Sequence, residues 1–88
     1  MDRTRLANIA SELIIKQIYS DLEGHISTWL FDDDTFSIQL THHDSRYDCG
    51  NKTLRIYEWQ SDEQILSTFK QMESVLDDER LIENEWNT

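Results

Sequence analysis

A chain of 88 residues is enough for one domain, and 18 acidic against 8 basic residues give it a formal net charge of −10. This balance argues against direct binding to nucleic acid or to an anionic membrane surface, because both require clustered Lys and Arg. It points to a basic protein partner, or simply to a well-solvated surface.

The first predicted element is an amphipathic helix over residues 3–22. Ile18 and Leu22 continue its apolar stripe with a drift around the axis. Gly24 is placed where a helix C-terminus favours a residue that can adopt positive φ. The stripe itself recurs at the i, i+3, i+4 spacing of one helix face: Leu6, Ile9, Ala10, Leu13 and Ile14.

Three strands are predicted next. Residues 25–31 place apolar side chains on both faces, so their pattern does not say which face is buried. Apolar and polar residues alternate over 36–41 and again over 53–57, as in strands with one buried face. Gly and Asn within 48–51 supply turn chemistry, so the two alternating runs form an antiparallel hairpin. Residues 32–34 are the tight polar connection between the first two strands.

A second helix begins after Ser61, which has Gln64 at the capping-box spacing. It ends near residues 77–79, where acidic side chains oppose the helix dipole. Residues 80–88 are expected to form a short turn, a short helix or a tail. The core-facing stripe of the second helix is Ile65, Phe69, Met72 and Leu76.

The predicted fold is a single α+β domain: helix, three-stranded antiparallel meander, helix, with both helices on one face of the sheet. Leu40 and Ile56 are expected in its core. Double-stranded-RNA-binding domains have the same order of elements. Their last helix opens with lysines, whereas this one opens with Ser61-Asp62-Glu63, so the sequence supports no family assignment.

The cluster of His42, His43 and Asp44, with Asp48 and Cys49 nearby, is the one place where a metal or a nucleophile could be sought. Consecutive strand residues point to opposite faces, so the two histidines cannot bind one ion from a regular strand. Cys49 has no accompanying catalytic signature. We therefore expect no catalytic residue, no metal and no cofactor, and the protein is predicted not to be an enzyme.

The cell compartment is also suggested by Cys49. It is the single cysteine of the chain, so it cannot form an internal disulfide, which fits a reducing compartment. No apolar run approaches the ~20 residues of a membrane helix. A cytoplasmic location is therefore expected.

Acidic residues form two foci that can bind a basic partner. One is the predicted connection between the first two strands, and the other is the end of the second helix with the segment that follows. Clusters at separated points can imitate the phosphates of a nucleic acid, or can oppose the basic surface of a toxin. The residues expected to bind are Asp32, Asp33, Asp34, Asp77, Asp78, Glu79 and Glu83.

Aromatic residues offer a second candidate surface. If the apolar residues of the hairpin face the helices, Trp29, Tyr57 and Trp59 point away from them. Exposed Trp and Tyr are typical anchors of protein interfaces. Two alternatives stay open: the C-terminal segment, through Leu81, Ile82 and Trp86, folds over this face, or the protein forms a homodimer through it.

The leading hypothesis is a small cytoplasmic inhibitor that binds a basic surface on a nucleic-acid-handling protein, as phage anti-restriction and anti-CRISPR proteins do. The comparison rests on size and charge. An immunity protein that neutralises a basic nuclease toxin is the nearest alternative. A dedicated chaperone or assembly adaptor would rely on the aromatic face more than on charge.

Overall fold

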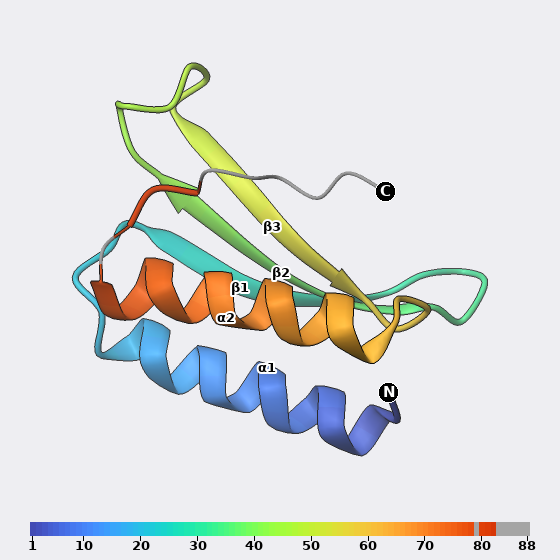
Figure 1. Ribbon diagram of the computed structural model, residues 1–88. Coiled ribbons are helices and arrows are strands. Elements are labelled where there is room, and N and C mark those ends of the chain that lie inside the picture. The colour runs from blue at the N-terminus through green and yellow to red at the C-terminus, as the bar shows by residue number, and fades with distance from the viewer. Residues whose placement is uncertain (79, 83–88) are drawn as a thin grey trace.

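The structure is a computed structural model that describes residues 1–78 and 80–82. Both helices lie on the same face of a three-stranded sheet (Figure 1), and the predicted α+β class is confirmed. Among the described residues, no helix is both long and apolar enough to cross a membrane. The elements are α1 (Arg3–Ile18), β1 (Gly24–Leu30), β2 (Phe36–His43), β3 (Asn51–Tyr57) and α2 (Asp62–Asp78).

The sheet is an antiparallel meander in the order β1-β2-β3. Its register places Leu40 of β2 between Ile26 of β1 and Leu54 of β3. Alternate residues of each strand therefore share one face, and this face packs against the helices.

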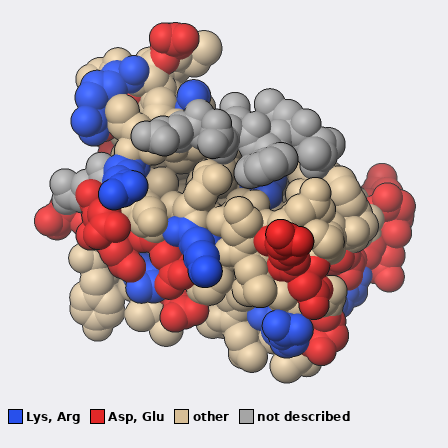
Figure 2. Space-filling view, viewed as in Figure 1, with Lys and Arg blue, Asp and Glu red and all other residues tan. Residues whose placement is uncertain are grey.

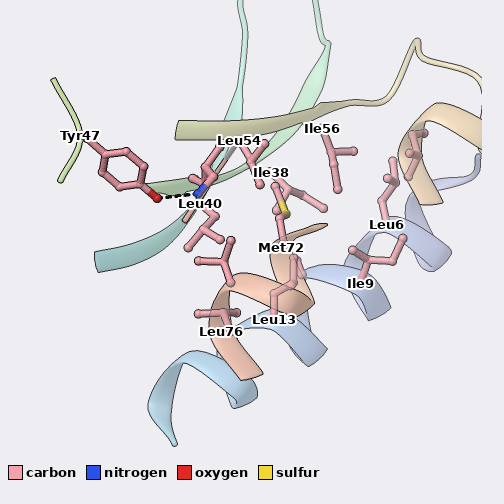
Figure 3. Close-up of a cluster of buried hydrophobic side chains, with 14 residues drawn as sticks. Leu6, Ile9, Leu13, Ile38, Leu40, Tyr47, Leu54, Ile56, Met72 and Leu76 are labelled. Carbon is pink, nitrogen blue, oxygen red and sulfur yellow. Dashed lines mark hydrogen bonds between the residues drawn. The ribbon is translucent and has the colours of Figure 1, made fainter. Parts of the chain in front are cut away.

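The core forms between this face and the helices (Figure 3). Leu40 is 2% exposed and Ile56 is fully buried, so both predicted core positions are confirmed. The start of α2 is also as predicted. Ser61 Oγ accepts a hydrogen bond from Gln64 N at 3.2 Å, and Gln64 Oε1 accepts one from Ser61 N at 3.1 Å.

The first helix is shorter than predicted. It ends at Ile18, with Tyr19 as its C-terminal cap, and Gly24 opens β1 instead of closing the helix. A side chain at Gly24 would meet the Thr41 carbonyl oxygen at 2.3 Å, so glycine allows the close approach of β1 to β2. The prediction that Ile14 belongs to the core stripe is wrong: its side chain is 41% exposed.

The chain after α2 returns to the helix-facing side of the sheet. Ile82 is 3% exposed and belongs to the core cluster. Its backbone N–H donates to the Tyr47 hydroxyl at 2.7 Å, and Figure 3 shows this hydroxyl at the margin of the core. The same hydroxyl lies 2.8 Å from Nδ1 of the buried His42. These contacts attach residues 80–82, which follow α2, to Tyr47 in the β2–β3 loop.

Candidate interaction surface

The histidine pair occupies opposite faces of β2, as the alternation of side chains predicted. His42 is buried on the helix-facing side. His43 lies on the other face, with its ring centroid 6.1 Å from that of His25. Cys49 is an exposed thiol in the β2–β3 loop. Within the described residues, no group of three or more His, Cys, Asp and Glu side chains could hold a metal ion.

The first acidic focus is the turn between β1 and β2. Asp34 adopts a left-handed backbone with φ 70°, and its N–H donates to the Phe31 carbonyl at 2.9 Å. Asp33 Oδ1 accepts a hydrogen bond from Thr35 N at 3.0 Å. Hydrogen bonds from Thr35 hold the pKa of Asp33 below its ordinary value. The hydrogen bonds that shape the turn therefore also stabilise the ionised carboxylate of Asp33.

An ion pair fixes this turn to the start of α1. Arg3 donates to Glu58 through Nε at 3.2 Å and through Nη2 at 2.8 Å. Its Nη2 also donates to the Asp34 carbonyl oxygen. Glu58 in turn accepts a hydrogen bond from Phe36 N at 2.6 Å. The Arg3 guanidinium and this N–H keep the pKa of Glu58 below its ordinary value.

Two carboxylates of the turn have no ion-pair partner among the described residues. Asp32 and Asp33 are exposed, and neither forms an ion pair with another described residue. Asp34 lies 3.9 Å from Arg3 Nη2, so its charge is partly balanced. The negative potential of the turn is therefore centred on Asp32 and Asp33.

Aromatic side chains gather beside the turn on the sheet face that points away from the helices. The Tyr57 and Trp59 rings are stacked, with centroids 5.3 Å apart and planes inclined by 13°. Phe31 lies 6.3 Å from Tyr57, measured between ring centroids. In the sheet register, Ser37 of β2 lies between Trp29 of β1 and Tyr57 of β3. Trp29 is 61% exposed and Trp59 58%.

We refer to these four aromatic residues and the three aspartates of the turn as the turn-end surface. Phe31 joins the two parts, because it precedes Asp32 in the chain and contacts Tyr57. Sequence reasoning selected the other members of the surface and missed Phe31. The signal was present, since Phe31 lies two residues after Trp29 and so shares its strand face.

The second acidic focus lies at the other end of the molecule, at the C-terminus of α2. Lys16 Nζ lies 2.9 Å from Asp77 and 3.7 Å from Glu73, so part of this charge is balanced. Asp78 is exposed, while Glu79 and Glu83 lie outside the described residues. Figure 2 shows acidic side chains towards both ends of the viewed face.

The alternative that Leu81 and Ile82 cover the aromatic face does not hold. Both residues pack with the core cluster on the helix-facing side of the sheet. Trp86 lies outside the described residues. Within the described part of the chain, the turn-end surface is therefore open to solvent.

An exposed aromatic cluster with carboxylates at its margin suits the side chains of a basic protein. An arginine can stack on Trp or Tyr while its guanidinium binds a carboxylate. Comparison of the chain with protein-family models, with curated proteins and with solved structures finds no match.

Proposed function

We propose that this protein is a non-catalytic inhibitor that binds a basic surface of a nucleic-acid-handling protein, in the manner of phage anti-restriction or anti-CRISPR proteins. The observation that supports the proposal most strongly is the turn-end surface. There, exposed aromatic rings adjoin the carboxylates of Asp32 and Asp33, which form no ion pair with another described residue.

The two parts of the surface have different roles in binding. The carboxylates attract a basic partner at long range and raise the association rate. The rings of Trp29 and Trp59 then anchor it, because aromatic residues dominate the energetics of many interfaces. Each cation–π contact with an Arg or Lys of the partner contributes about 0.5–2 kcal/mol.

The arrangement of charge supports a partner that normally binds nucleic acid. The turn lies beyond the N-terminal end of the helices, and Asp77 and Asp78 lie at the C-terminal end of α2, which has 17 residues. At ~1.5 Å per residue, this helix separates the two acidic ends by roughly 25 Å. Such separated groups of carboxylates present a partner with charges spread along one length, as a phosphate backbone does.

Exposed tryptophans favour a second candidate, a chaperone or assembly adaptor that binds through the aromatic cluster alone. This protein would bind an apolar segment, and its affinity would depend little on salt. An immunity protein for a basic nuclease toxin relies on the same contacts as the leading proposal and differs only in the identity of the partner.

The test begins with capture of partners on the immobilised protein from native lysate, followed by affinity measurements on the isolated partner. We expect a basic partner that duplex nucleic acid displaces, with at least about tenfold weaker binding at high than at low salt. At low salt, the variant Asp32→Asn/Asp33→Asn/Asp34→Asn should bind this partner more weakly than the wild-type protein does. Asn keeps the Asx turn and tolerates positive φ.

A charge-matched control separates local contacts from net charge. Glu12→Gln/Asp21→Asn/Asp48→Asn also removes three exposed carboxylates, all outside the turn-end surface, and should leave most of the affinity intact. An affinity that does not change with salt or in either triple variant, but is lost in Trp29→Ala, would contradict the inhibitor proposal and favour the adaptor.

A further inference from the structure

The outer edge of β1 has hydrogen-bonding groups that no other described residue uses. At the two ends of the strand, the Glu23 carbonyl accepts from His43 N and the Phe31 N–H donates to the Thr35 carbonyl. Odd-numbered residues therefore bond to β2, and even-numbered residues direct N–H and C=O to the open edge. The Gly24 carbonyl accepts from Gln17 Nε2 at 3.0 Å.

Three residues remain whose outward groups have no partner among the described residues: Ile26, Thr28 and Leu30. They are symmetric about Thr28. An antiparallel copy of the same strand, related by a two-fold axis at Thr28, would pair all of their N–H and C=O groups. Ile26 would then face Leu30 of the second copy on the helix-facing side.

This edge lacks the features by which proteins keep sheet edges from pairing. Residues 24–30 contain no Lys, Arg, Asp, Glu or Pro, and the register with β2 runs without a bulge. The opposite edge strand, β3, carries Lys52 and Arg55, and its Tyr57 N–H donates to the Gln60 side chain. One edge is protected by charge and the other is not.

Exposed apolar side chains flank the same edge. Gln17 faces β1, while Lys16 faces α2 through its ion pairs. At ~100° per residue, Ile14 and Ile18 both lie about 160° from Lys16, on the β1 side of α1. Ile18 is 69% exposed and Leu30 56%.

We propose that the protein forms a homodimer in which two β1 strands pair antiparallel about Thr28, producing a continuous six-stranded sheet. The second copy is the occupant that the edge fits, because it supplies an uncharged strand with the same spacing of outward groups. This inference does not rest on the proposed function, and it uses a different surface from the stacked rings of Tyr57 and Trp59.

Charge at the ends of the paired strands sets how the dimer responds to salt. In this register, Glu23 lies opposite Asp33 of the second copy, and each chain has a formal charge of −10. Like charges opposite one another destabilise strand pairing. Dimerisation should therefore strengthen as salt screens the repulsion.

The test combines sedimentation over a range of concentrations with amide hydrogen exchange on the wild-type protein. We expect reversible dimers and exchange protection at Ile26, Thr28 and Leu30 that rises with concentration. The amides of Ser27 and Trp29, which bond to β2, should be protected at every concentration. A monomer at millimolar concentration in high salt would overturn the proposal, as would a dimer in which the three edge amides stay unprotected.

Two variants test the register. Thr28→Glu places like charges at the two-fold axis and should weaken dimerisation at least about tenfold, while Ser67→Glu adds the same charge on the exposed surface of α2. In a Cys49→Ser background, Thr28→Cys should form an intersubunit disulfide with oxidised glutathione, because paired Cα atoms lie ~5.5 Å apart. Ser67→Cys should not. Equal cross-linking of both cysteines would rule out a two-fold axis at Thr28.

Discussion

Replacing Tyr47 with phenylalanine removes one oxygen atom that two distant parts of the chain share. The Ile82 N–H can only donate, so the hydroxyl accepts from it at 2.7 Å and keeps its own proton for His42 Nδ1 at 2.8 Å. Burial raises the pKa of Tyr47, so the hydroxyl stays protonated at neutral pH. The edge-on contact of the Tyr47 and His42 rings, 5.3 Å between centroids, would survive the substitution.

The expected loss follows from the groups left behind. Ile82 is 3% exposed and His42 2%, so a buried donor and a buried acceptor would each lose a partner. An unsatisfied buried group costs ~1–3 kcal/mol. For the two groups together, we expect the free energy of unfolding to fall by about 2–6 kcal/mol.

Urea denaturation measures this loss, and amide exchange at Ile82 locates it. Tyr57→Phe is the matched control, because it removes the same atom from a hydroxyl that bonds to no other described residue. It should change stability by less than ~0.5 kcal/mol. A Tyr47→Phe variant as stable as wild type, with the Ile82 amide still protected, would show that the hydroxyl does not hold this segment.

Two further predictions concern the core and its buried histidine. Leu40→Ala should lower the free energy of unfolding by about 2–5 kcal/mol. The control Leu66→Ala changes a side chain that is 40% exposed and should cost far less. Equal losses in urea denaturation would contradict the assigned orientation of the sheet. Burial lowers the pKa of His42 from its ordinary value of 6.5. The unfolded chain therefore binds more protons, and stability should fall as the pH drops through 6.5. His42→Gln should remove this step in pH-dependent denaturation, whereas His43→Gln should retain it.

Local patterns in the sequence predicted the elements that local physics controls. The period-two alternation around Leu40 and Ile56 identified β2 and β3 together with their buried face, because each strand has one apolar side. The capping box of Ser61 and Gln64 fixed the start of α2, since both of its hydrogen bonds join residues three apart.

The contacts missed from sequence join residues far apart in the chain. The Tyr47 hydroxyl bonds to a backbone group 35 residues away, and no periodicity indicates such a bond. The Arg3–Glu58 ion pair at the turn-end surface spans 55 residues. Ile14 was assigned to the core because the helical pattern alone does not say where the sheet beneath the helix ends.

Salt dependence can separate the two associations proposed for this chain, because they predict opposite signs. A basic partner is attracted to Asp32 and Asp33, so screening should weaken that complex. Two copies with a formal charge of −10 each repel, so screening should strengthen the β1 dimer. Asp33→Asn should weaken partner binding. It should strengthen the β1 dimer, because it removes the repulsion between Asp33 and Glu23 of the second copy. Dimerisation that weakens with salt would show that the copies associate through charged contacts, and would refute the uncharged β1 edge as their interface.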